Sequence, residues 1–199
     1  MLYWWNAARD GVAKISPAGF MLVSSGLVVL QALVLLAMGQ PPICTCGYVK
    51  LWHGVVLSDE NSQQIADWYT FSHIIHGIAF YFILWLIAPK SSVWLRFAIA
   101  IAVEVGWEIL ENTPMIIDRY REATIALGYS GDSILNSLSD IVMMALGFLG
   151  ARRLPVWASV AIVLILELVP LIAIRDNLLL NVIMLVAPSD AILNWQSRA

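Results

Sequence analysis

Hydrophobic residues fall into five long runs that short polar segments separate. Each run is close in length to a helix that crosses a bilayer, which needs about 20 residues. The runs cover residues 17–38, 68–88, 93–111, 133–151 and 155–174. A further apolar run at 177–187 is too short to span and suits an interfacial or re-entrant segment. The pattern predicts an all-α polytopic bundle of about five transmembrane spans, with residues 1–199 forming a single integral membrane domain.

Composition agrees with this prediction. The chain has 199 residues, of which 60% are hydrophobic and 13% charged, and its mean hydropathy is +0.80. These values are typical of membrane proteins and make the lipid bilayer the expected partner. A net charge of −3 gives no reason to expect nucleic-acid binding. Residues 1–14 lack a compact apolar core with a cleavage site, so we expect no cleaved signal peptide, and their aromatic start suits an interfacial anchor.

The positive charges favour one orientation of the bundle. With the N-terminus inside, six Lys and Arg residues lie on the cytoplasmic side and five on the outer side. The inner connections are short, and each carries positive charge, as at Lys90 and at Arg152 with Arg153. Positive charge in short loops marks the cytoplasmic side. We therefore expect an N-inside, C-outside protein.

Three of the predicted spans carry polar residues at helical spacing. Residues three or four apart share one face of a helix. The three series are His73 with His76, then Glu104, Glu108 and Glu111, then Asp132, Asn136 and Asp140. At 1.5 Å rise per residue, all three reach similar depths in the outer half of the membrane. Each ionisable group in a span costs about 2.5–3.5 kcal/mol on insertion scales, so their coincidence predicts a functional pocket. Glu167 in the last span is near enough in depth to join them.

The acidic residues of this pocket have no Lys or Arg at matching depth in any span. Protonation, a metal cation, or an outer loop that inserts Arg119 or Arg121 would each balance their charge. His73 and His76 suit one metal ion, with Glu104 and Asp132 as further ligands. Imidazole and carboxylate donors together favour zinc, iron or manganese over magnesium.

Each part of the cluster also has a structural interpretation. The histidines are then buried groups bonded to carbonyl or tyrosine oxygens, and Asp132 caps the N-terminus of a helix. Asn136 and Asp140 then hold neighbouring helices together. Serine nucleophiles are available at Ser133 and Ser137, but no nucleophile-elbow motif surrounds them.

The leading functional interpretation is an intramembrane hydrolase or transferase that acts on a lipid or lipid-linked envelope substrate. Glu108 or Glu111 would be the general base, Asp140 would orient the substrate and Asn136 would position it. Two alternatives remain open: a proton-coupled transporter, and a non-catalytic envelope factor whose polar residues hold helices or a partner together.

The two cysteines form the sequence Cys44-Thr45-Cys46. A zinc ribbon needs two cysteine pairs, and a redox motif usually has two residues between its cysteines. The spacing leaves two possibilities: a pair of loop thiols, or a local disulfide if the loop is extracytoplasmic.

Four stretches resemble a family of bacterial inner-membrane proteins that carries a domain-of-unknown-function label. They are Cys-Thr-Cys-Gly-Tyr-Val-Lys-Leu-Trp at 44–52, Asp-Trp-Tyr-Thr-Phe-Ser-His-Ile-Ile-His-Gly at 67–77, and the polar motifs at 104–114 and 131–140. The resemblance implies residence in the bacterial inner membrane and brings no established activity.

A weaker resemblance is to VanZ-like membrane proteins, which are linked to glycopeptide-antibiotic resistance. It rests on a His, a Glu pair and an Asp-x-x-x-Asn motif in successive helices. The matching positions are His73, Glu108, Glu111, Asp132, Asn136, Asp140 and Gly147. Glu111 stands where those proteins have Gln, which makes this pocket more acidic.

Overall fold

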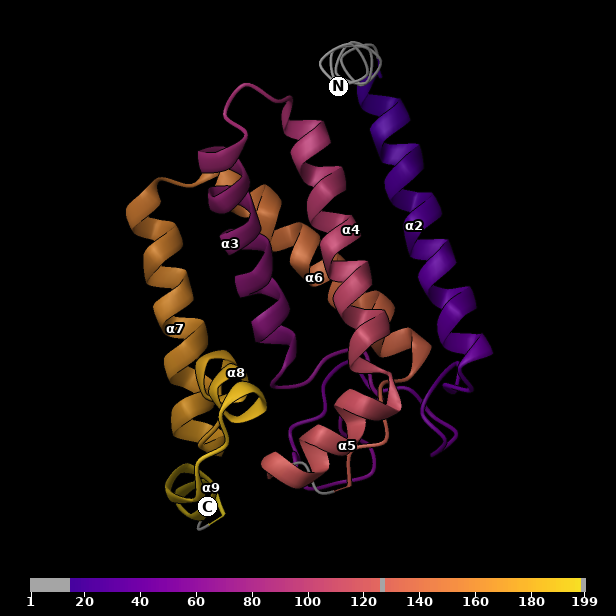
Figure 1. Cartoon of the computed structure of the whole chain (residues 1–199), viewed down its shortest axis with the longest axis vertical. Coiled ribbons are helices and arrows are strands. Elements are labelled where there is room, and N and C mark those ends of the chain that lie inside the picture. The colour runs from indigo at the N-terminus through magenta and orange to yellow at the C-terminus, as the bar shows by residue number, and fades with distance from the viewer. Residues whose placement is uncertain (1–14, 126–127, 198–199) are drawn as a thin grey trace.

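The computed structural model describes residues 15–125 and 128–197. Within these residues every regular element is a helix (Figure 1). The helices are α2 (Pro17–Ala37), α3 (Thr70–Ile87), α4 (Val93–Glu111), α5 (Pro114–Ala123), α6 (Ile134–Arg153), α7 (Val156–Ile174), α8 (Leu178–Val186) and α9 (Asp190–Gln196). The interfacial anchor and the absence of a signal peptide, both predicted for residues 1–14, lie outside the described residues.

The five long helices coincide with the five predicted hydrophobic runs. Four of them, α2, α3, α6 and α7, have the length and apolar composition of membrane-spanning helices. Helix α4 is as long as α7, at 19 residues, but it carries Arg96 and three glutamates. It runs beside α3 and α6 within the bundle (Figure 1). The all-α membrane bundle is confirmed, and a fifth span through α4 stays a prediction.

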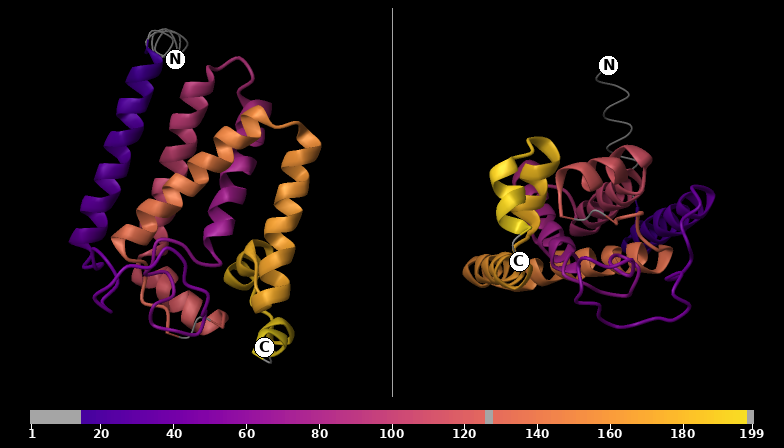
Figure 2. Two further views of the ribbon diagram at one scale, coloured as in Figure 1. Left: turned by 180° about the vertical axis from the view of Figure 1, so that it is seen from behind. Right: turned by 90° about the horizontal axis from the view of Figure 1, so that it is seen from below.

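Figure 2 shows how the long helices are arranged. Helices α2 and α7 lie at opposite edges, with α3, α4 and α6 between them. The loop at 38–69 and the short helices α5, α8 and α9 gather at one end of the bundle, which is the end where α3 and α6 begin. The 177–187 run forms the 9-residue helix α8, which is too short to span and packs near α5.

Serine side chains cap several helices. Ser92 Oγ accepts a hydrogen bond from Leu95 N at the start of α4, and Ser133 Oγ accepts one from Asn136 N at the start of α6. Such a side chain satisfies a backbone N–H that has no partner inside the helix. The structural interpretation of Asp132 as the cap of this helix is wrong. Ser133 takes that place and leaves the Asp132 carboxylate for other partners.

Helices α3 and α6 cross with their backbones in close contact. A Cβ atom on Gly77 would collide with the Met144 carbonyl, and one on Gly147 would collide with the Ile74 carbonyl. Small residues allow helices to approach this closely inside a membrane. His73 lies one turn before Gly77, and Asp140 lies two turns before Gly147, so the crossing brings those side chains together.

An apolar layer lies beside the polar one. Buried Leu84 of α3, Phe97 and Ile101 of α4, and Met144 and Phe148 of α6 pack into one cluster. In each helix these residues lie farther from the 38–69 loop than the polar series does. The bundle is therefore closed by apolar packing on the predicted cytoplasmic side of the polar residues.

Candidate functional site

The two histidines of α3 meet Glu104 of α4. His73 Nδ1 lies 2.7 Å from Glu104 Oε1, and His76 Nδ1 lies 3.1 Å from the same oxygen. His73 and Glu104 are buried, and the His76 side chain is 20% exposed. The predicted convergence of these two series is therefore present as direct contact.

Glu108 lies behind this group and joins a third helix to it. Its Oε1 is 3.3 Å from His73 Nδ1, and its Oε2 accepts a hydrogen bond of 2.5 Å from Ser137 Oγ of α6. Gln31 Nε2 of α2 donates to the same Ser137 hydroxyl at 2.6 Å. Sequence reasoning missed Gln31, which is fully buried, although an amide side chain within a mostly apolar span was a usable signal.

Asp140 lies on the other side of His73. Its Oδ2 is 3.7 Å from His73 Nε2. The residue is only 4% exposed, and its Oδ1 has no hydrogen-bond partner among the described residues. Glu108 Oε1 is likewise buried without a hydrogen-bond partner there. Two buried carboxylates therefore lie beside His73, and each has one oxygen that accepts no hydrogen bond from the described residues.

Asp132 belongs to a separate hydrogen-bonded group. Asn112 Nδ2 and the Tyr129 hydroxyl donate to its carboxylate at 2.8 Å and 2.9 Å, and its own N–H donates to Asn112 Oδ1. Gly131 holds the turn before it at φ +91°, where a Cβ would collide with Asn112 and Gln40. Burial raises the pKa of Asp132 from 3.8 to about 6, although both donors favour the charged form. The predicted metal ligand Asp132 therefore does not join the histidine group.

A cavity of about 300 Å³ connects these groups. The predicted residues that line it are His73, His76, Glu104, Glu111, Asp132, Asn136 and Asp140. Glu108 is not part of the lining. No Lys or Arg lines the cavity in the described part of the chain. The site is thus acidic, as the sequence predicted.

Most of the remaining cavity wall is aromatic and aliphatic, and its further polar members are Asn61, Ser62, Asp67, Ser72 and Asn181. Tyr69, Phe80, Trp107, Tyr120 and Tyr129 supply the rings. Val103 of α4 and Val182 of α8 also line it, and each is about half exposed on the surface of the bundle, at 50% and 49%. The cavity therefore extends from the polar cluster to an apolar flank between α4 and α8.

The loop at 38–69 closes the end of the cavity. Asn136 Nδ2 donates to the Gln64 carbonyl at 2.8 Å, and Ser133 Oγ donates to the Gln63 carbonyl at 3.0 Å. Since Ser133 bonds to the loop and Ser137 bonds to Glu108, no described hydrogen bond joins either hydroxyl to a histidine. A role for Ser133 or Ser137 as a histidine-activated nucleophile therefore gains no support.

Two other residue expectations differ from the structure. The side chains of Arg119 and Arg121 donate to the carbonyls of Leu185 and Tyr129, so neither arginine pairs with the acidic cluster. Glu167 accepts a hydrogen bond from Leu179 N and is not part of the cavity lining. Charge balance through the outer loop and a place for Glu167 in the cluster are therefore both wrong.

A buried network around Asp176 ties the C-terminal helices to α3. The carboxylate accepts hydrogen bonds from the Tyr69 hydroxyl, Asn181 Nδ2 and Gln196 Nε2, each at 3.0 Å. Burial raises its pKa from 3.8 to about 6 despite these donors. Asp176 follows the predicted span at 155–174, and nothing in the local sequence pattern marks it as buried. The network positions α8 as a wall of the cavity.

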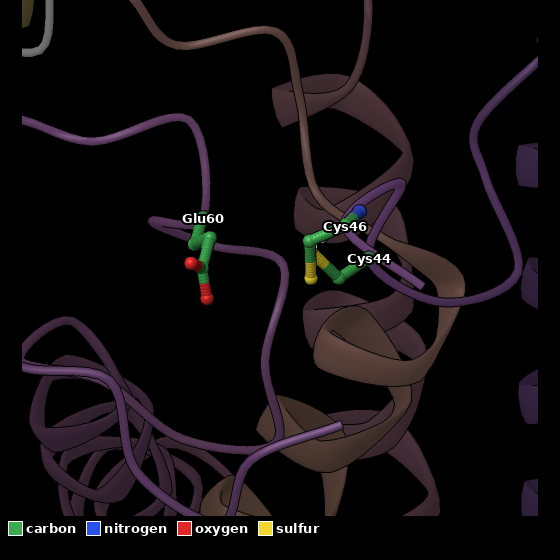
Figure 3. Close-up of side chains that lie close together, drawn as sticks. All are labelled: Cys44, Cys46 and Glu60. Carbon is green, nitrogen blue, oxygen red and sulfur yellow. Dashed lines mark hydrogen bonds between the residues drawn. A yellow bond between two sulfur atoms is a disulfide. The ribbon is translucent and has the colours of Figure 1, made fainter. Parts of the chain in front are cut away.

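Cys44 and Cys46 form a disulfide in the loop above the site (Figure 3). Of the two possibilities left by the sequence, the structure has the local disulfide. Glu60 lies near it and pairs with Lys50 at 2.6 Å, which lowers the pKa of Glu60 to about 2. The sulfur atoms are joined to each other, so this group is not a metal site in its oxidised form.

Comparison with known proteins places the chain in a family. Residues 35–198 match the family described as "Protein of unknown function (DUF2585)". The chain belongs to this family. A relative from Sphingopyxis alaskensis, described as a UPF0314 protein, is 57% identical over 94% of this chain and 98% of its own length. Another, from Paracoccus denitrificans, is 59% identical over 86% of this chain and 89% of its own length.

The DUF2585 match confirms the resemblance to a bacterial membrane family of unknown function. It covers α3, α4 and α6, and with them every residue of the cavity lining. The comparisons do not show the VanZ-like resemblance. No solved structure matches the chain.

Proposed function

We propose that this DUF2585 protein is an intramembrane hydrolase or transferase for a lipid or lipid-linked envelope substrate. The observation that carries the proposal is the cavity, which joins an acidic polar end to an apolar flank of the bundle. Such a shape suits an amphiphile whose headgroup enters the cavity while its chains stay in the bilayer. A volume of about 300 Å³ is at the lower end of the range for ligand pockets.

The polar groups support chemistry better than simple helix association. Polar side chains that only hold helices together should have their hydrogen bonds satisfied by each other. Asn112 with Asp132 follows that rule, whereas Gln31 donates to Ser137 but has its own Oε1 buried without a partner among the described residues. Asp140 and one oxygen of Glu108 do not follow it either, because they are buried without a donor. Unpaired acceptors beside an open cavity favour a site that binds something.

Glu111 is the best placed general base of the two glutamates predicted for this role. It lines the cavity, whereas Glu108 lies behind His73 and is engaged by Ser137. In hydrolysis Glu111 takes a proton from water while the water oxygen bonds to the acyl carbon or phosphorus of the substrate. The bond from that atom to the leaving oxygen breaks, and the leaving oxygen takes the proton back from Glu111. In transfer, an acceptor hydroxyl replaces water.

The disulfide supports a site on the outer side of the bacterial inner membrane. Disulfides persist in oxidising compartments and are rare in the cytosol. The Cys44–Cys46 disulfide lies in the loop that closes the cavity. This agrees with the N-inside orientation expected from the positive charges, and the bacterial relatives agree with an inner-membrane location.

The proposal is tested by replacing the base in living cells. In a strain without this gene, mass spectrometry of envelope lipids should show one lipid class that accumulates. The wild-type chain and Glu122→Gln, an exposed glutamate on α5, should restore the profile. Glu111→Gln should leave it unrestored at equal protein level, because a general base contributes about 10²–10⁴-fold to rate. Full restoration by Glu111→Gln, or no lipid change on deletion, would contradict the proposal.

A further inference from the structure

We infer that His73, His76 and Glu104 bind one divalent transition-metal ion, of the zinc, iron or manganese type, at the wall of the cavity. The inference deepens the proposed function and rests on it only for the use of the metal in the reaction. Two imidazoles and one carboxylate are a donor set that catalytic zinc and non-haem iron sites use, with further positions left for water or substrate.

The donor atoms are already close together. The Nδ1 atoms of both histidines face the Glu104 carboxylate, at separations from 2.7 Å to 3.2 Å. Two ligands of a tetrahedral zinc ion stand roughly 3.3 Å apart, because each bond is about 2.0–2.1 Å long. The three ligand atoms, one from each residue, all lie within 4.8 Å of one another, so small side-chain movements bring them to this spacing. The side chains come from two helices of the bundle, which fixes their relative placement.

The charges around the donors call for a cation. Glu104, Glu108 and Asp140 all approach His73, at 2.7 Å, 3.3 Å and 3.7 Å. No described salt bridge brings a Lys or Arg to any of them. Glu108 and Asp140 are 1% and 4% exposed, and each has an oxygen with no hydrogen-bond partner. A divalent ion beside His73 compensates buried negative charge that no described Lys or Arg balances.

The surroundings of His73 have the form of an outer shell for a metal ligand. A metal-bound histidine usually directs its second ring nitrogen to a carboxylate or carbonyl, which fixes the orientation of the ring. With Nδ1 on the metal, the Nε2 of His73 faces Asp140. Glu108 lies against the same ring and is held by Ser137, which Gln31 holds in turn. This arrangement gives α2 and α6 a positioning role at a site whose ligands come from α3 and α4.

The metal would face the cavity. His73, His76 and Glu104 all belong to its lining, as does Glu111. An ion held by three protein ligands therefore has positions open toward a headgroup or a water molecule in that space. Asp132, which the sequence analysis had added to the ligands, is occupied by Asn112 and Tyr129, so the set contains three residues instead of four.

Elemental analysis of the full-length chain tests the site. The protein is expressed in medium with zinc, iron and manganese, purified in detergent without chelator, and compared with His76→Ala, Glu104→Gln and His53→Ala. His53 is the third histidine and bonds to Val55 O and Ser58 in the outer loop. The wild type and His53→Ala should carry close to one metal ion per chain. His76→Ala and Glu104→Gln should carry less than about one tenth of that, since even outer-shell changes cost 10–100-fold in affinity.

A second measurement uses only the wild type, so it tests the inference even if a variant folds poorly. Metal-free wild-type protein is titrated with Co²⁺, and the visible absorption of the bound ion is followed. A saturable spectrum at one equivalent, displaced by Zn²⁺, is the expected result. Wild-type protein that is metal-free on purification and gives no saturable Co²⁺ spectrum overturns the inference without reference to any variant. Retention of full metal content by well-folded His76→Ala and Glu104→Gln overturns the ligand set.

These outcomes are separate from those for the proposed function. A protein that binds one metal ion but changes no lipid would contradict the enzyme proposal and leave the metal site standing. Lipid turnover by protein stripped of metal would contradict the use of the metal in the reaction and leave the enzyme proposal standing, while the metal site itself is decided by the metal content and the Co²⁺ titration.

Discussion

Two buried carboxylates outside the spans make the free energy of unfolding depend on pH. Asp132 and Asp176 both have a pKa raised from 3.8 to about 6, in each case because burial disfavours the charged form more than the hydrogen-bond donors favour it. Between pH 3.8 and about pH 6, these two carboxylates therefore bind more protons in the folded chain than in the unfolded chain. The free energy of unfolding therefore falls as pH rises from about 4 to about 6.

Asp176→Asn should remove one part of this pH dependence. The wild type should lose on the order of 2 kcal/mol between pH 4 and pH 7 through Asp176, since one pKa unit corresponds to about 1.4 kcal/mol. The variant should be less stable at low pH, because an amide cannot accept all the hydrogen bonds, but its stability should fall less with pH. Thermal unfolding in detergent across this range measures the slopes, with Asp190→Asn, an exposed residue of α9, as the control. Equal slopes in all three proteins would contradict the assignment.

The position of most site residues follows from helical spacing, whereas their partners do not. The three- and four-residue intervals placed His73, Glu104 and Asp140 on faces that the structure brings together. Asp132 instead accepts hydrogen bonds from Asn112 and Tyr129, because the turn at Gly131 directs its side chain toward them. Such a turn depends on contacts between distant loops, which periodicity does not encode.

The α3–α6 crossing is the element on which the site depends most directly. Gly77 and Gly147 let the two backbones touch, and His73 and Asp140 lie one and two turns away on the same helices. His73 would not come within 3.7 Å of Asp140 at an ordinary interhelical distance, because these two side chains lie on α3 and α6.

Gly77→Ala should therefore disturb both stability and the site. Its Cβ would meet the Met144 carbonyl, so the helices must separate, at a cost of about 1–3 kcal/mol for overpacking. Gly150→Ala on α6 is the matched control, because its Cβ meets no atom within 4 Å. Thermal unfolding in detergent compares the two. A Gly77→Ala protein as stable as the Gly150→Ala protein would show that the crossing is looser than described.

At the level of elements, long apolar helices were predictable and short ones were not. All five hydrophobic runs match a long helix, because length and apolar content define a span. The sequence analysis treated the region of α5 as an outer loop and left α8 and α9 without a helical prediction. These helices are too short to be recognised as spans, and their positions depend on contacts such as Arg119 with Leu185 and Asp176 with Gln196.

The whole molecule separates an apolar layer from a polar layer along the same three helices. The polar layer lies at the end that carries the disulfide loop, and the cavity leads from it to the apolar flank between α4 and α8. An acidic site deep in an otherwise apolar bundle is costly to maintain. That cost is explained if the cavity receives the polar end of a membrane lipid.

The most direct test of this central claim is turnover of a lipid by the purified protein. Full-length protein is placed in nanodiscs made from the lipids of the strain that lacks it, and product formation is followed by mass spectrometry. We predict that the wild type consumes the accumulated lipid and that Glu111→Gln does so about 100-fold more slowly or less. Absence of any lipid conversion by metal-loaded wild-type protein, or equal rates for the wild type and Glu111→Gln, would contradict the account.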